Sequence, residues 1–214
     1  MDSNQQDKTH YINSLISYDC EFTAYYDKIE KSRHYVDLQP AITKEAGKLL
    51  SLLVRLINAK QVLEIGTAVG YSSHWIVSGL QKTGGHLITI DNHQRTSKEA
   101  LQNFENSKID DYVEFINEDA QEVLPALASN YFDIVFLDCS KALYTPLYNQ
   151  IYRILKKGGL FVIDDTLISF QSTARDSLKK SVEFFNATLA KDGNYYSTVV
   201  DIGHGLTLAI KEGD

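Results

Sequence analysis

The stretch VLEIGTAVGYS at residues 62–72 decides the fold, because it runs from an apolar strand through a glycine-containing turn into a helix. Gly66 and Gly70 let the backbone approach a ligand closely, and the N–H groups that open the helix can hold an anionic group such as a carboxylate. The spacing departs from GxGxxG, the fingerprint in which a dinucleotide pyrophosphate lies against the helix. The turn favours a nucleotide-like ligand and disfavours a dehydrogenase, although glycines at such turns also serve packing alone.

Short β-branched runs alternate with helical stretches after this turn. The runs are QVLEIG (61–66), HLITID (86–91), VEFINED (113–119), FDIVFLD (132–138) and GLFVIDD (159–165). Such alternation predicts βαβ units and a parallel sheet. A helix is expected from about Thr173 to Lys191, and YYSTVVDIG (195–203) and LTLAIK (206–211) then predict an antiparallel hairpin. The predicted fold is α/β: a Rossmann-like, doubly wound, mostly parallel seven-stranded sheet with a C-terminal antiparallel hairpin and N-terminal helices.

Two helices are expected before the first strand. From Tyr11 to about Lys31, apolar and aromatic residues recur at steps of three and four, which predicts an amphipathic helix. A second helix is predicted in ITKEAGKLLSLLVRLINA (42–59), with Thr43 as its N-cap and an end near Asn58.

Length and composition fit an ordinary globular protein of 214 residues, with 43% hydrophobic and 23% charged side chains. One domain is expected over 1–214, in which residues 1–59 form a helical cap and dimer or substrate segment and residues 60–214 form the core. The formal net charge of −7 and the pI near 5.4 give no general attraction to phosphate backbones or anionic membranes. Nucleic acid is therefore not the favoured partner.

The cysteines and the apolar runs bear on location. Cys20 and Cys139 are far apart and lack metal-ligand spacing, which predicts neither a disulfide framework nor a zinc site. The polar start MDSNQQDKTHY (1–11) has no secretory signal, and the apolar runs are far shorter than the roughly 20 residues that cross a bilayer. We expect a cytoplasmic protein without a membrane partner.

Two further acids follow strands near the glycine turn. Asp91 ends the second run, where a carboxylate can accept hydrogen bonds from both ribose hydroxyls of a nucleotide. Asp119 closes the third run, where it can accept from an adenine amino group. A solvated acid at a strand end is the alternative for Asp91. Together with the turn, these acids predict three features that converge on one crevice.

A second group of acids follows the next two strands. Asp138 ends FDIVFLD, Lys141 lies one helical turn later, and Asp164 and Asp165 end GLFVIDD. Three carboxylates at neighbouring strand ends repel one another, and a cation usually holds such a cluster together. Ligands that are all oxygen favour Mg²⁺, Mn²⁺ or Ca²⁺ over zinc. Lys141 can serve as a base if desolvation and a nearby cation lower its pKa, while a surface lysine paired with an acid is the alternative.

Six motifs occur in the order and approximate spacing of one known family. They are VLEIGTAVGYSS, ITIDN, EDAQEVLP, FDIVFLDCSK, GGLFVIDD and IGHGLTLAIK. Over about residues 38–211 the chain resembles the S-adenosylmethionine-dependent O-methyltransferases, which include the catechol and caffeoyl-coenzyme A enzymes and their small bacterial relatives. The segment LQPAITKEAGKLL (38–50) resembles the part of these enzymes that lies over the cofactor and the acceptor.

The resemblance implies roles for particular residues. The cofactor S-adenosyl-L-methionine (SAM) would be bound by Glu64, Gly66, Thr67, Gly70, Tyr71, Ser72, Asp91, Asp119, Ala120 and Asp138. A divalent cation, Mg²⁺ first and Mn²⁺ or Ca²⁺ as alternatives, would be held by Asp138, Asp164 and Asp165. The family has Asn at the position of Asp165, so this site carries one more negative charge. Lys141, with Asp138, would be catalytic and take the hydroxyl proton, and the protein would be a homodimer.

The function implied is SAM-dependent, metal-assisted methylation of a hydroxyl on a small phenolic or catechol-like acceptor. Some bacterial relatives instead methylate 5-hydroxyuridine in tRNA, and a non-catalytic cofactor-binding module is a third alternative. Binding of folded RNA would require a basic surface beside the crevice. The candidates for that surface are Lys28, Lys31, Arg33, Lys44, Lys48, Arg55, Arg175, Lys179 and Lys180.

Overall fold

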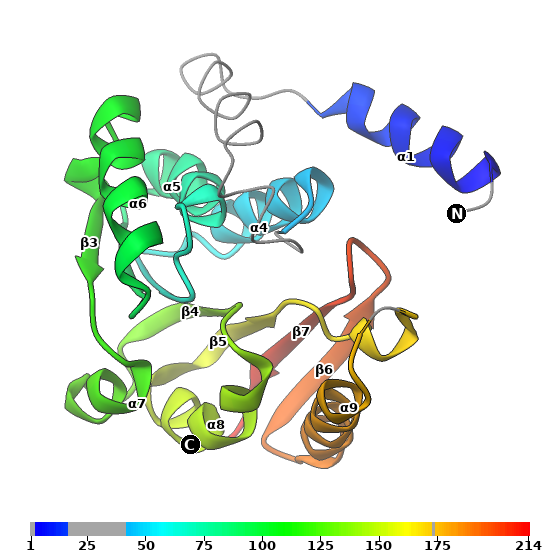
Figure 1. Ribbon diagram of the computed structural model, residues 1–214. Coiled ribbons are helices and arrows are strands. Elements are labelled where there is room, and N and C mark those ends of the chain that lie inside the picture. Colours follow the sequence, from blue (N-terminus) through cyan, green and yellow to red (C-terminus); the bar gives the residue numbers. More distant parts are fainter. Residues whose placement is uncertain (1–2, 17–41, 173) are drawn as a thin grey trace.

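The computed structural model of the protein describes residues 3–16, 42–172 and 174–214. Its elements form three layers, with the sheet between α4, α5 and α6 on one face and α8 and α9 on the other (Figure 1). The strands are β1 (Gln61–Ile65), β2 (His86–Ile90), β3 (Val113–Ile116), β4 (Phe132–Leu137), β5 (Leu155–Ile163), β6 (Tyr195–Val200) and β7 (Leu206–Lys211).

The sheet has the strand order β3-β2-β1-β4-β5-β7-β6. The first five strands pair in parallel, while β7 runs antiparallel to both β5 and β6. The order of the strands reverses at β1, with β2 and β3 on one side of it and β4 and β5 on the other. In sheets of this kind, ligands bind at the carboxyl ends of the strands beside this switch point. The predicted fold class is confirmed.

The helices connect the strands and precede β1. The α-helices are α1 (Ser3–Leu15), α4 (Lys44–Leu56), α5 (Tyr71–Thr83), α6 (Gln94–Ser107), α7 (Ala120–Val123), α8 (Tyr144–Ile154) and α9 (Asp176–Lys191). Short 3₁₀ turns are η1 (Asp110–Tyr112), η2 (Leu124–Ala126), η3 (Lys141–Leu143) and η4 (Ile168–Phe170).

The predicted helix ends are met to different degrees. Thr43 caps α4, because its side chain accepts from the backbone N–H of Ala46, as expected. Helix α1 begins at Ser3, earlier than Tyr11, because polar residues extend an exposed helix without adding to the apolar period, and it ends at Leu15, so one unbroken helix to Lys31 is wrong. The expected continuation to Lys31 falls on residues 17–41, which lie outside the described residues, as does Thr173. Helix α9 begins at Asp176, a favourable acid in a first turn.

The central strands are buried on both faces because helices cover both sides of the sheet. Val62 and Ile134 belong to the core cluster under α4, α5 and α6. Their neighbours Leu63 and Val135 belong to the cluster under α8 and α9. This alternation fixes the register of β1 and β4, and therefore fixes which polar residues emerge together at their carboxyl ends.

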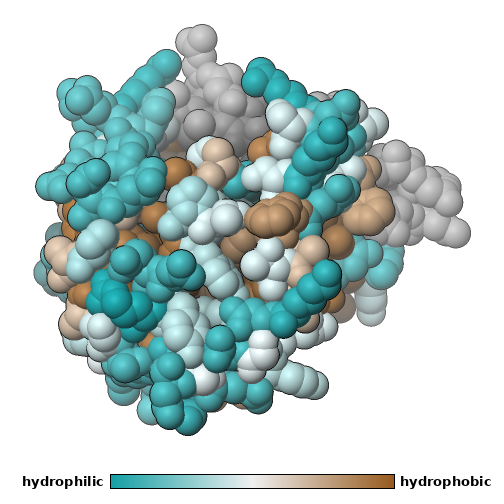
Figure 2. Space-filling view, turned by 90° about the horizontal axis from the view of Figure 1, so that it is seen from below, coloured by the Kyte–Doolittle hydropathy of each residue, from teal (hydrophilic) through white to brown (hydrophobic). Residues whose placement is uncertain are grey.

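The outer surface on the side of α7, α8 and α9 is mostly hydrophilic, with hydrophobic residues in separate small patches (Figure 2). In the described part of the chain, no helix combines the length and the apolar character that crossing a membrane requires.

Candidate active site

A cavity of about 520 Å³ lies at the carboxyl ends of β1, β2, β4 and β5. It brings together most of the residues predicted to bind the cofactor. Those in its wall are Gly66, Thr67, Tyr71, Ser72, Asp91, Asp119, Ala120 and Asp138. Lys141 and Asp165 line the same cavity, so the two predicted groups of polar residues share one space.

The turn after β1 requires both of its glycines. Gly66 has φ +108°, and a Cβ there would overlap the carbonyl oxygen of Asp138 at the end of β4. Gly70, the N-cap of α5, has φ +85°, and a Cβ there would overlap the ring of Phe104 on α6. Left-handed backbone and close packing both select glycine. Gly70 lies outside the cavity wall and shapes it through the turn.

Asp91 ties this turn to the end of β2. Its Oδ2 accepts from the backbone N–H of Ala68 at 2.8 Å, and its Oδ1 accepts from that of His93 at 2.8 Å. An ionised carboxylate has about four lone-pair positions, so two remain for a ligand. Asp91 is thus fixed by backbone donors and can still accept hydroxyl groups from the cavity.

Asp119 is held in a similar way at the start of α7. Its Oδ1 accepts from the backbone N–H of Gln121 at 2.9 Å, and its Oδ2 accepts from Nδ2 of Asn92 at 3.1 Å. Asn92 also lines the cavity, and the sequence analysis had given it no role. Its place directly after Asp91 was the available signal.

Glu64 lies behind the cavity wall. It is fully buried, and its Oε2 accepts from Oγ of Ser73 at 2.5 Å and from Oγ1 of Thr89 at 2.7 Å. Burial raises the pKa of Glu64 to about 7, although these hydroxyl donors oppose the shift. The structure places it beneath the turn, and its direct contact with a cofactor stays a prediction.

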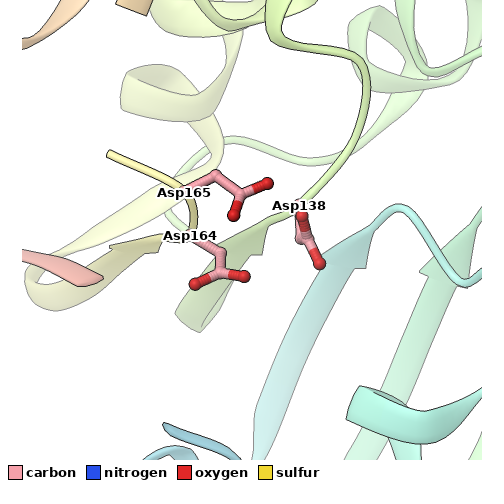
Figure 3. A group of neighbouring side chains, drawn as sticks. All are labelled: Asp138, Asp164 and Asp165. Carbon is pink, nitrogen blue, oxygen red and sulfur yellow. The ribbon is translucent and has the colours of Figure 1, made fainter. Parts of the chain in front are cut away.

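Three carboxylates meet beside the cavity, as the sequence predicted. Asp138 follows β4 while Asp164 and Asp165 follow β5, and one oxygen from each lies within 4.8 Å of the others (Figure 3). Burial and the negative charges of Asp138 and Asp165 raise the pKa of Asp164 well above its ordinary value. Burial also raises the pKa of Asp138 to about 6. The oxygen-only donors and their mutual repulsion fit a hard divalent cation.

Lys141 lies against this cluster. Its Nζ is 3.0 Å from Oδ1 of Asp138 and 2.8 Å from Oδ2 of Asp165. Burial alone would lower the pKa of Lys141, but the acidic groups of Tyr144, Asp138 and Asp165 raise it well above its ordinary value. This direction is opposite to the lowered pKa that a base needs, because the ion pairs outweigh desolvation.

His204 is a site residue that the sequence analysis missed. It lies between β6 and β7, and its Nδ1 is 3.0 Å from Oδ1 of Asp165. Burial would raise the pKa of Asp165, yet His204 and Lys141 lower it below its ordinary value. The motif IGHGLTLAIK contains this residue, between the two strands predicted to form the hairpin, and gave it no role in the site. Its contact depends on β7 pairing with β5, which sequence spacing does not reveal.

The remainder of the wall is largely apolar and was also not predicted residue by residue. It includes Ile42 before α4, Leu143, Ile168 and Leu178. Cys139, which follows the end of β4, also lines the cavity. Cys20 and three basic residues considered for RNA binding, Lys28, Lys31 and Arg33, lie outside the described residues.

Comparison with known proteins identifies the family. The site combines a Rossmann-like sheet with a glycine turn, acids at the strand ends and a carboxylate cluster. A family model described as O-methyltransferase matches residues 18–212. The chain therefore belongs to the O-methyltransferase family. The resemblance inferred from the sequence motifs is confirmed.

Individual relatives agree with this assignment. A protein from Mycobacterium sp. (strain JLS), provisionally named as an O-methyltransferase, is 33% identical over 178 residues and covers 80% of each chain. A catechol O-methyltransferase from Niastella koreensis is 28% identical over 213 residues, which are 96% of this chain and 92% of that protein.

Solved structures share the fold over the whole chain. The O-methyltransferase TomG from Streptomyces achromogenes, involved in tomaymycin synthesis and solved in complex with SAM, has a TM-score of 0.82 at 26% identity, with 100% of both chains covered. An SAH-bound methyltransferase from Podospora anserina has a TM-score of 0.88, covers 100% of this chain and 97% of its own, and is 17% identical, which supports the fold alone.

Proposed function

We propose that the protein binds SAM in the cavity and transfers its methyl group to a hydroxyl of a small phenolic or catechol-like acceptor, assisted by a divalent cation. The observation that carries the proposal is the cluster of Asp138, Asp164 and Asp165 beside the cavity, with Lys141 paired to it. The SAM complex of TomG and the catechol O-methyltransferase relative support the cofactor and the acceptor class.

The cofactor is proposed to lie along the end formed by β1 and β2. The glycine turn permits close approach to the backbone, and the N-terminus of α5 favours the carboxylate of the methionine part. Asp91 has lone pairs left for the ribose hydroxyls, and Asp119 with Asn92 offers an acceptor for the adenine amino group. Asp91, Asn92 and Asp119 all line the cavity, as these roles require.

The acceptor is proposed to lie at the opposite end of the cavity. A phenol has an ordinary pKa near 10 and is a poor nucleophile when neutral. A bound divalent cation would favour its ionised form and fix the position of the oxygen. Apolar side chains of Ile168, Leu143 and Leu178 line the same cavity and suit the ring of a small aromatic compound.

Lys141 is proposed to take the proton of the acceptor hydroxyl. Nζ must first lose a proton of its own, and its ion pairs with Asp138 and Asp165 oppose that loss. The base role therefore requires these two ion pairs to be weakened in the working site. Carboxylates drawn away from Nζ would produce that change.

One assay separates the candidate acceptors. Purified protein is incubated with methyl-labelled SAM and Mg²⁺, in parallel with a panel of catechols and with tRNA whose 5-hydroxyuridine oxygen is unmethylated. We expect label in the catechol panel. Label in tRNA alone would support the RNA alternative, for which Lys44 on α4 and Lys179 on α9 are the described candidates nearest in sequence to cavity residues Ile42 and Leu178. Label in neither pool would contradict the proposed acceptor classes.

A further inference from the structure

Asp165 occupies a backbone position that few residue types accept. Its φ is +59°, and its carbonyl oxygen accepts from the N–H of Ile168 at 3.1 Å, which closes the turn after β5. Left-handed backbone at a residue other than glycine is tolerated best by Asn and Asp. Asn and Asp, an amide and a carboxylate, are therefore the side chains that this position favours. The carboxylate requires compensation that the amide does not.

The side chain of Asp165 is almost completely buried, at 2% exposure for the residue, and a buried carboxylate without donors is costly. Two donors from distant parts of the chain meet this requirement. Lys141 approaches Oδ2 at 2.8 Å and His204 approaches Oδ1 at 3.0 Å. Because an ionised carboxylate has no proton to give, Nδ1 of His204 is the donor in this contact.

The backbone of His204 is held by the segment that follows β5. Its carbonyl oxygen accepts from the N–H of Leu167 at 2.8 Å, and the carbonyl oxygen of Gly205 accepts from that of Thr166 at 3.0 Å. Gly205 has φ +94°, and a Cβ there would overlap Leu167, so the turn packs tightly against the segment after Asp165. The imidazole is therefore presented to Asp165 by a fixed piece of backbone.

We infer that His204 is a positioning residue that orients the Asp165 carboxylate toward the space shared with Asp138 and Asp164, and so sets the affinity of the site for a divalent cation. The inference rests on the proposed cation site. Each Asp165 oxygen accepts one hydrogen bond and keeps a further lone pair, so the carboxylate can be both clamped and available to a cation. His204 thereby supplies one of the two donors that this buried carboxylate requires.

The test measures Mn²⁺ affinity by calorimetry at one fixed pH, without acceptor or turnover. Removing a residue that orients a metal ligand typically weakens metal binding about 10- to 100-fold, and we expect His204→Ala to lie in this range. His204→Asn keeps an N–H donor near the position of Nδ1 and should restore most of the affinity. His86→Ala is the matched control, because His86 is the first residue of β2 and the cavity lies at the carboxyl ends of the strands. This variant should bind Mn²⁺ as the wild type does.

A double-mutant cycle tests whether His204 changes the Mn²⁺ affinity through Asp165. In an Asp165→Asn background the carboxylate is gone, so His204→Ala should cost much less than it does in the wild type. A full loss in that background, or unchanged Mn²⁺ affinity in His204→Ala, would overturn the inference while leaving the cation site intact. A wild-type protein that binds no Mn²⁺ would overturn both. If His204→Ala does not fold, His204→Phe removes the donor while keeping a planar ring at this position, and it replaces His204→Ala in the cycle.

Discussion

The two ends of the cavity hold their carboxylates in different ways. Asp91 accepts from two backbone N–H groups, that of Ala68 in the turn after β1 and that of His93 in the turn after β2. Asp165 depends on two side chains, Lys141 and His204, which come from separate connections of the sheet. The proposed cofactor end therefore depends on backbone donors and on β1 lying beside β2. The carboxylate cluster requires β4 beside β5, and its His204 donor also requires β7 beside β5.

The largest expected effect is a loss of turnover when Lys141, beside the carboxylate cluster, is replaced. Lys141→Ala removes the proposed base, and a general base is commonly worth about 10²–10⁴ in rate. Turnover at saturating acceptor should fall by this amount, while SAM affinity measured by calorimetry should stay nearly unchanged. A loss of turnover below roughly threefold would contradict the role of Lys141.

The cofactor end should respond to acid through His74 on α5. His74 is fully buried, its Nδ1 contacts the carbonyl oxygen of Gly70 and its Nε2 contacts Oγ of Ser107. Burial lowers the pKa of His74 from 6.5 to about 4. Between these values the unfolded chain binds more protons, so the free energy of unfolding should fall as the pH drops from 6.5 toward 4, by roughly 3 kcal/mol at most.

Urea unfolding across that pH range checks this contribution. His74→Gln should show a flatter decline than the wild type, because it has no imidazole to protonate on unfolding. Identical slopes in the two proteins would show that other groups account for the acid sensitivity. Acidic groups elsewhere titrate in both proteins, so the difference between the two slopes reports the contribution of His74 alone.

A smaller effect is expected from Asp91→Ala. Losing a charge-assisted hydrogen bond typically costs about 1.5–3 kcal/mol, which is roughly 10- to 100-fold in SAM affinity. Mn²⁺ affinity should be unaffected, because Asp91 follows β2 and lies outside the carboxylate cluster. Calorimetry that finds equal SAM affinity in mutant and wild type would remove Asp91 from the cofactor site.

The smallest effect is expected from Asp165→Asn. The substitution keeps the side-chain shape at φ +59° and replaces the carboxylate with a neutral amide. Activity should survive, but half-saturation should move to a higher metal concentration because a neutral amide oxygen attracts a cation less strongly. A metal titration that coincides with that of the wild type would show that the extra charge of Asp165 does not act on the cation.

This contrast also explains what the sequence could predict. The alternation of strands and helices predicted the sheet, and adjacent strand ends predicted that Asp138 would meet Asp164 and Asp165. His204 was missed because its contact spans 39 residues and requires β7 to pair with β5. The raised pKa of Lys141 was not foreseen either, because its direction depends on whether ion pairs or desolvation dominate, and only the assembled distances decide that.

The central claim is that the three carboxylates bind a divalent cation on which methyl transfer depends. The direct measurement is turnover of the wild-type protein after chelation with EDTA, followed by addition of Mg²⁺ or Mn²⁺, with bound metal determined by elemental analysis. Chelation should abolish methyl transfer, and either metal should restore it in the wild type but not in Asp138→Ala or Asp164→Ala. Undiminished turnover in excess EDTA, with no metal detected in the protein, would contradict the account.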